Sequence, residues 1–116
     1  MIRGLHAMFY STRAAELRAF FRDQLGLHGN DLGDGWLIFD LAEADLGVHP
    51  TDADGPPSGT ADISFYCDDL AATVRDLESR GVNFTQPIED HGYGLVTFFE
   101  APGEFTVQLY QPKYMK

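Results

Sequence analysis

The chain has 116 residues, and 44% of them are hydrophobic, so it is long enough for one domain with its own core. Its 18 acidic residues outnumber its 8 basic residues, which gives a net charge of −10. This balance argues against nucleic acid and anionic membranes as partners, because both are bound through clustered Lys and Arg. The charge permits a cationic small-molecule ligand, although its simpler role is solubility.

The sequence also bears on the cellular compartment. No apolar run approaches the ~20 residues that a membrane-spanning helix needs. The first residues, MIRGLHAMFYS, lack the apolar core of a signal peptide. A single cysteine, Cys67, excludes an internal disulfide and favours a reducing compartment. We therefore expect a cytoplasmic protein that does not span a membrane.

The first half of the chain reads as a strand, a helix and three further strands. Residues 5–11 (LHAMFYS) alternate as a strand does, and residues 13–25 carry apolar side chains at helical spacing. Thr12 is the expected N-cap of this helix, and Gly26 is its expected stop. Three strands are then predicted, over residues 27–32, 36–41 and 44–49.

The second half repeats this order after a linker. Residues 51–59 (TDADGPPSG) are polar and rich in Gly and Pro, which is typical of a linker. Residues 60–67 alternate as a strand, and Asp68 or Asp69 can cap the helix that Gly81 ends. A short strand, a loop and two longer strands are predicted over residues 82–85, 86–94, 95–100 and 104–110.

The two halves form an internal repeat, in which His6 corresponds to Asp62. We expect one domain over residues 1–116, with module one at 1–50 and module two at 60–116. The predicted class is α+β. Two paired βαβββ modules would form an eight-stranded curved mixed sheet, with the helices on its convex side and a concave cup on the other.

The face of the strands that looks into the cup has an unusual composition. It lacks Lys and Arg and is rich in His, Tyr, amide and carboxylate groups, which is the composition of a small-molecule pocket. Its tyrosines could equally close the cup or lie at a dimer interface. The predicted ligand-binding residues are His6, Tyr10, His49, Asp62, Ser64, Tyr66, Gln108 and Tyr110.

The paired pattern, the opening LHAMFYS and the closing YGLVTFFEAPGEFTVQLYQP resemble the vicinal oxygen chelate superfamily. This superfamily includes glyoxalase I, bleomycin resistance proteins, fosfomycin-modifying enzymes and extradiol dioxygenases. The resemblance covers nearly the whole chain, although Ala101-Pro102-Gly103 stands where the family's last turn reads Asp-Pro-x-Gly. The resemblance implies the fold and a homodimer. It gives little information about the reaction, because members of the superfamily catalyse several different reactions.

Many members of this superfamily hold a divalent metal in the cup, and the resemblance implies where its ligands would fall. The first ligand falls on His6, and the second falls near Gly47, where His49 could substitute. The third falls on Asp62 instead of the family's His, and the fourth on Gln108 instead of Glu. This set could hold Zn, Ni, Mn or Fe. Alternatively, His6 and Asp62 would hydrogen-bond each other without metal.

Functions from different classes therefore stay open. One is a binding protein of the bleomycin-resistance type, which holds a small organic molecule in the cup without the usual metal or any other cofactor. The alternative is a metal-dependent lyase, isomerase or dioxygenase that uses His6, His49 and Asp62. In that case Asp62 would have to bind metal and also serve as the base that proton transfer needs. A third possibility is a degenerate scaffold with a structural or regulatory role, which no residue of the sequence supports.

Overall fold

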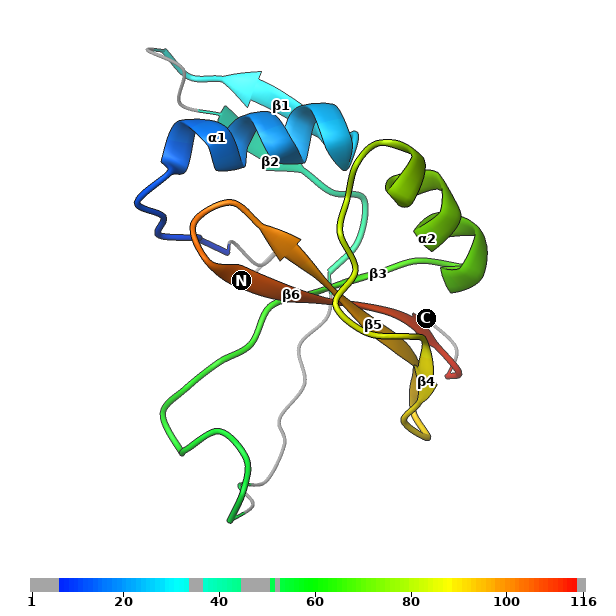
Figure 1. Ribbon diagram of the computed structural model, residues 1–116. Coiled ribbons are helices and arrows are strands. Elements are labelled where there is room, and N and C mark those ends of the chain that lie inside the picture. The colour runs from blue at the N-terminus through cyan, green and yellow to red at the C-terminus, as the bar shows by residue number, and fades with distance from the viewer. Residues whose placement is uncertain (1–6, 34–36, 45–50, 52, 115–116) are drawn as a thin grey trace.

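The computed structural model of the chain describes residues 7–33, 37–44, 51 and 53–114. Within these residues the chain has an α+β fold with two α-helices, one π-helical turn and six strands in two sheets (Figure 1). The elements are α1 (Ala14–Ala19), the π-helical turn η1 (Phe20–Gln24), β1 (His28–Asp31), β2 (Leu37–Asp40), β3 (Ser64–Tyr66), α2 (Leu70–Ser79), β4 (Glu89–Asp90), β5 (Gly94–Ala101) and β6 (Phe105–Pro112).

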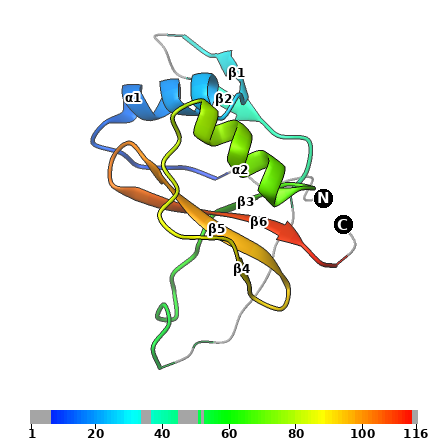
Figure 2. The ribbon, with the colours of Figure 1, turned by 45° about the vertical axis from the view of Figure 1, so that its right-hand side comes forward.

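The second half of the chain forms a four-stranded sheet in the order β3-β6-β5-β4. β3 runs parallel to β6, and the other pairs are antiparallel. Helices α1 and α2 lie on the same side of this sheet (Figures 1 and 2). The helix, the final hairpin and the core of the strand predicted over residues 60–67 are confirmed in the second half. The strand predicted over residues 82–85 is wrong, because this segment makes only an isolated bridge between Phe84 and Phe99. The loop predicted over residues 86–94 is wrong in part, because β4 pairs with β5 there.

In the first half, β1 and β2 form an antiparallel pair, which confirms the strands predicted over residues 27–32 and 36–41. The strand predicted over residues 5–11 is wrong for residues 7–11, which have no strand pairing. Alternation alone does not make a strand when no neighbouring strand is there to pair with it. Residues 45–49 of the third predicted strand lie outside the described residues, and the eight-stranded cup is not seen in the part that the structure describes.

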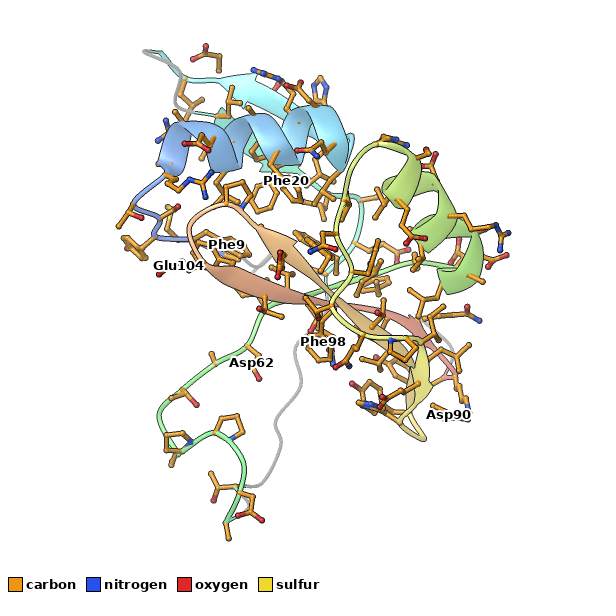
Figure 3. All side chains as sticks on the ribbon, in the orientation of Figure 1. Phe9, Phe20, Asp62, Asp90, Phe98 and Glu104 are labelled. Atoms are coloured by element: carbon orange, nitrogen blue, oxygen red, sulfur yellow. The ribbon has the colours of Figure 1, made fainter. Side chains whose placement is uncertain are left out.

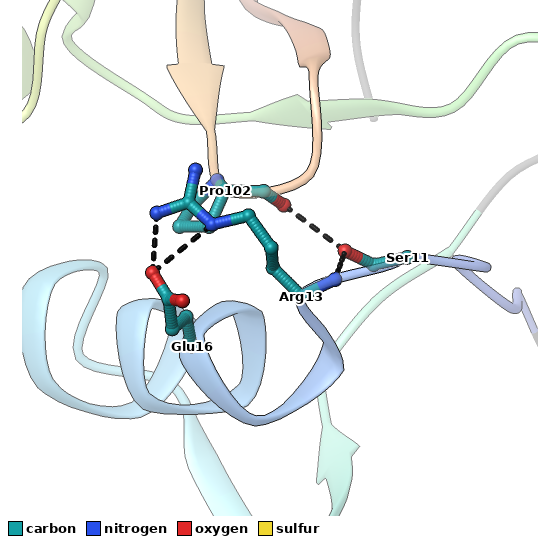
Figure 4. A network of polar contacts seen from close by, with 4 residues as sticks. All are labelled: Ser11, Arg13, Glu16 and Pro102. Carbon is teal, nitrogen blue, oxygen red and sulfur yellow. Dashed lines mark hydrogen bonds and ion pairs between the residues drawn. The ribbon is translucent and has the colours of Figure 1, made fainter.

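Residues 7–11 are instead held by side-chain contacts. The ring of Phe9 packs edge-on against Phe21 and against Phe105, with ring centroids 5.3 and 5.1 Å apart. The hydroxyl of Ser11 donates to the carbonyl of Pro102 at 3.3 Å, in the turn between β5 and β6 (Figure 4). Phe9 and Ser11 thereby fix this segment to the last hairpin.

Helix α1 begins one residue later than expected. Arg13 occupies its N-cap position, so the prediction that Thr12 caps it is wrong. The Ser11 hydroxyl accepts from the backbone N–H of Arg13 at 3.0 Å, and the Arg13 guanidinium pairs with Glu16 (Figure 4). The expected stop is confirmed, because Gly26 has φ +73°.

The ends of α2 agree with the sequence. Asp69 is its N-cap, and a carboxylate oxygen of Asp69 accepts from the backbone N–H of Ala72 at 3.0 Å. The structure therefore selects Asp69 over Asp68. Gly81 ends the helix with φ +88°.

The hydrophobic core lies between the two helices and one face of the four-stranded sheet. Phe99 of β5 is 1% exposed and contacts the rings of Phe20, Phe65 and Phe84. Leu70 and Leu77 supply the buried side of α2. The buried core residues are Leu17, Phe20, Phe21, Leu70, Leu77, Val82, Phe99, Ala101, Val107 and Leu109. Neither described helix is long and apolar enough to cross a membrane.

Candidate functional site

The candidate site lies on the face of the four-stranded sheet that is turned away from the helices. Phe65 and Leu109 point into the core, so their neighbours along each strand point to the opposite face. Those neighbours are Ser64 and Tyr66 on β3 and Gln108 and Tyr110 on β6. In Figure 3, Phe98 lies on this outer side of the sheet, whereas Phe20 lies between α1 and the sheet. The predicted facing of these four residues agrees with the structure.

A chain of hydrogen bonds crosses this face. Ser64 and Gln108 lie directly opposite each other in the parallel pairing of β3 and β6. The Ser64 hydroxyl donates to Oε1 of Gln108 at 2.6 Å. The Nε2 group of Gln108 donates to the hydroxyl oxygen of Tyr93 at 3.0 Å. Both ends of the half-buried Gln108 amide are therefore bonded to neighbouring side chains.

Four tyrosines group beside this chain of hydrogen bonds. The ring of Tyr110 lies 5.9 Å from that of Tyr66 and 5.7 Å from that of Tyr93. The Tyr110 and Tyr114 hydroxyls are hydrogen-bonded at 2.9 Å. Tyr110 is only 8% exposed, and this burial raises the pKa of its phenol well above the usual range. Tyr110 is thus an aromatic wall whose hydroxyl remains protonated at neutral pH.

A carboxylate from the first half of the chain reaches the same cluster. The hydroxyl of Tyr66 donates to Oε1 of Glu43 at 2.7 Å. This hydrogen bond, with the loss of solvent around the phenol and the negative charge of Glu43, raises the pKa of Tyr66 to about 12. Tyr66 therefore acts as a hydrogen-bond donor rather than as a base at neutral pH.

An open cavity of about 1690 Å³ extends from this face to the helix side of the sheet, where Leu17 and Phe21 also line it. It is larger than most small-molecule pockets, which measure about 300–1,000 Å³. The structure brings six predicted site residues to its lining: Tyr10, Asp62, Ser64, Tyr66, Gln108 and Tyr110. Tyr10 is 87% exposed, and Asp62 also lies exposed, on the segment just before β3 (Figure 3). The other two predicted residues, His6 and His49, lie outside the described residues.

The described residues offer little for a metal ion. Across residues 7–33, 37–44, 51 and 53–114, no three His, Cys, Asp or Glu side chains gather closely enough to hold one. Of the four implied ligands, the structure describes Asp62 and Gln108. The Oε1 atom of Gln108, its only metal-binding atom, already accepts from Ser64. A neutral amide oxygen is also a weaker ligand than the carboxylate that the family has at this position.

The structure adds three site residues that sequence reasoning missed. Tyr93, Tyr114 and Glu43 all line the cavity and bond to predicted residues. Glu43 lies between the strands predicted over residues 36–41 and 44–49, and Tyr114 follows the last predicted strand. Tyr93 lies between two glycines in HGYG, which signals a loop but not what the loop faces.

Comparisons with known proteins agree with this fold. A family model described as the Glyoxalase/Bleomycin resistance protein/Dioxygenase superfamily matches residues 5–109. No protein with a curated description matches the chain.

Three solved structures illustrate the likeness. TnmS3, an antibiotic-binding protein from Streptomyces sp. CB03234, is 20% identical with a TM-score of 0.66, covering 97% of this chain and 100% of its own. A superfamily member from Sphaerobacter thermophilus is 25% identical with a TM-score of 0.62, and the match covers 95% of this chain and 98% of that one. A lactoylglutathione lyase from Agrobacterium tumefaciens is 17% identical with a TM-score of 0.61, and the match covers 89% of this chain and 88% of that one. At these identities, the first and third show a common fold alone.

Proposed function

The chain belongs to the Glyoxalase/Bleomycin resistance protein/Dioxygenase superfamily, and we propose that it binds a small organic molecule on the outer face of its four-stranded sheet. The observation that carries this proposal is the make-up of the cavity over that face. Aromatic walls from Tyr66, Tyr93 and Tyr110 surround the hydrogen-bonded pair of Ser64 and Gln108. Apolar walls with a few convergent polar groups are typical of small-molecule sites.

The proposed contacts include the residues that sequence analysis selected. Ser64 and Gln108 would form the floor and Tyr66 and Tyr110 the walls. The exposed Tyr10 and Asp62 would form the rim. His6 and His49 remain proposed ligand contacts at positions outside the described residues. The similarity to an antibiotic-binding protein from Streptomyces supports an organic molecule as the ligand class. The net charge of −10 is compatible with a ligand that carries positive charge.

We also propose the division into module one (1–50), a linker (51–59) and module two (60–116), and a homodimer. β3 supports this proposal because, among the described strands, it pairs with β6 only and its other edge is free. Another strand on that edge would extend the sheet toward the eight-stranded cup. Residues 53–60 run away from the body of the protein (Figure 1).

Binding can be tested with a defined aromatic probe. 2-Ethylnaphthalene would be titrated into ¹⁵N-labelled protein, because a two-ring aromatic suits the tyrosine walls. We expect saturable shifts of the backbone amides of Ser64, Gln108 and Tyr110. Gln108→Ala should weaken binding, whereas Glu78→Gln, on the exposed side of α2, should leave it unchanged. Shifts confined to the helices, or no saturable shifts, would contradict the proposal.

The metal-dependent alternative requires a separate experiment. Protein purified without chelator would be analysed for metal and then titrated with Zn, Ni, Mn and Fe. Stoichiometric metal that disappears in Asp62→Ala and in Gln108→Ala would favour a metal-dependent enzyme. Protein that stays empty throughout would favour metal-free binding.

A further inference from the structure

We propose that the hydroxyl of Tyr93 is the group that recognises the ligand, by donating a hydrogen bond to an acceptor oxygen such as a carbonyl. This inference rests on the proposed binding function and names the chemistry of one ligand group. Tyr93 lies in the turn between β4 and β5 and lines the large cavity. It is 44% exposed, so a bound molecule can reach it.

The direction of the hydrogen bonds leads to this assignment. Ser64 donates to Oε1 of Gln108, which is the acceptor end of the amide. The donor end, Nε2, must then point the other way, and it donates to the oxygen of Tyr93. The Tyr93 oxygen is thus an acceptor in this bond, and its own hydrogen is available to a second partner.

The neighbouring phenols have other hydrogen-bond partners. Tyr66 already donates to Glu43, and one of the Tyr110 and Tyr114 hydroxyls donates to the other. Within the described part of the chain, the Tyr93 hydroxyl has a hydrogen bond to Gln108 and no acceptor for its own hydrogen. A ligand with an acceptor oxygen would complete this set of bonds, whereas a purely hydrocarbon ligand would leave it open.

Tyr93 is also held in position before any ligand binds. Its ring packs edge-on against Tyr110 and His91, with centroids 5.7 and 6.2 Å away. The backbone N–H of Lys113 donates to the carbonyl of Tyr93 at 2.9 Å, and the Lys113 ammonium pairs with Asp90 at 2.5 Å. A donor fixed in this way does not have to be ordered when the ligand binds, which favours affinity.

The experiment compares two probes that differ by one carbonyl group. 2-Acetylnaphthalene, labelled with ¹³C at its carbonyl carbon, and 2-ethylnaphthalene would be titrated into the whole chain and into Tyr93→Phe. We expect the substitution to weaken binding of the acetyl probe by about tenfold and to leave the affinity for the ethyl probe nearly unchanged. The ¹³C resonance of the bound carbonyl should also move upfield in Tyr93→Phe, because it loses its hydrogen bond.

Two further variants test the direction of the hydrogen bonds. In Ser64→Ala the amide of Gln108 is free to turn, so that Oε1 accepts the Tyr93 hydrogen and removes the donor from the cavity. The acetyl probe should then bind more weakly because the Tyr93 hydrogen is no longer available to its carbonyl, and Ser64→Thr, which keeps a hydroxyl, should restore its affinity. A Ser64→Ala variant that keeps full preference for the acetyl probe would overturn the assigned direction.

The outcomes separate this inference from the function on which it rests. If both probes bind to the sheet face with equal affinity, and Tyr93→Phe weakens neither or both alike, the donor role of Tyr93 is wrong and the binding function stands. If neither probe shifts the amides of Ser64, Gln108 and Tyr110, the binding function is wrong, and this inference falls with it.

Discussion

The hydroxyl of Tyr66 on β3 donates a 2.7 Å hydrogen bond to Oε1 of Glu43, a residue of the first half of the chain. This contact joins the segment after β2 to the edge strand of the four-stranded sheet. It also positions a carboxylate beside the tyrosines that line the candidate site.

This pair should be visible in the titration of the tyrosines. The folded-state pKa of Tyr66 is raised from 10.0 to about 12, so the protonated phenol is favoured by folding. Its contribution to stability is therefore complete below about pH 10 and is lost as the pH rises through about 12. In Glu43→Gln the pKa of Tyr66 should fall back toward 10, as measured by tyrosinate absorbance against a Tyr66→Phe reference. Glu78→Gln is the control with the same change of charge, and an identical titration in both variants would contradict the role of Glu43.

Gly103 should be intolerant of any side chain. Its φ is +98°, and an added Cβ would lie 2.0 Å from the hydroxyl oxygen of Ser11. Gly92 has a similar φ of +85°, but an added Cβ would meet nothing within 4 Å. We expect Gly92→Ala to cost about 1–2 kcal/mol from backbone strain alone. Gly103→Ala should cost about 2–4 kcal/mol, because the Ser11 side chain must also turn away and lose its hydrogen bond to Pro102. Urea unfolding measures both, and equal costs would show that Ser11 does not approach the turn.

The two neighbouring phenylalanines of β5 should differ sharply. Phe99 is 1% exposed among the core rings, whereas Phe98 is half-buried on the outer face. Phe99→Ala should reduce the free energy of unfolding by about 3–5 kcal/mol through loss of burial and a new cavity. Phe98→Ala should cost about 1 kcal/mol. The reverse order of the two costs would mean that the faces of β5 are assigned wrongly.

The start of α2 offers a test on two adjacent aspartates. Asp69 accepts from the backbone N–H of Ala72, and its removal leaves that donor without this partner. Asp69→Ala should therefore cost about 1 kcal/mol in thermal or urea unfolding. Asp68→Ala should cost a few tenths at most, because Asp68 does not cap the helix. Similar costs for the two variants would argue that the cap alternates between them.

The second half of the chain could be predicted closely because its signals are local. Alternation in residues 64–66 and 105–112, a capping aspartate and a glycine stop each act within a few residues. The first half was predicted less well. Residues 7–11 have the same alternation, yet Phe9 packs against Phe105 and Ser11 bonds to Pro102, at the far end of the chain. No local pattern encodes a partner that distant.

The same distinction between local and distant signals applies to the candidate site. The facing of Ser64, Tyr66, Gln108 and Tyr110 could be predicted, because side chains alternate along a strand whatever its neighbour is. The partners of these residues could not. Tyr93, in the turn between β4 and β5, meets Gln108 of β6, and Glu43 meets Tyr66 although the two are 23 positions apart in the chain.

The sequence by itself determined the family, the helix and most of the strands of the second half, and which side chains share a face. These properties depend on residue spacing and on short-range backbone chemistry. Only the tertiary structure decided which hydrogen-bonding group faces the cavity. That choice depends on the register of β3 against β6 and on the approach of a distant turn, which are set by packing between segments far apart in the chain.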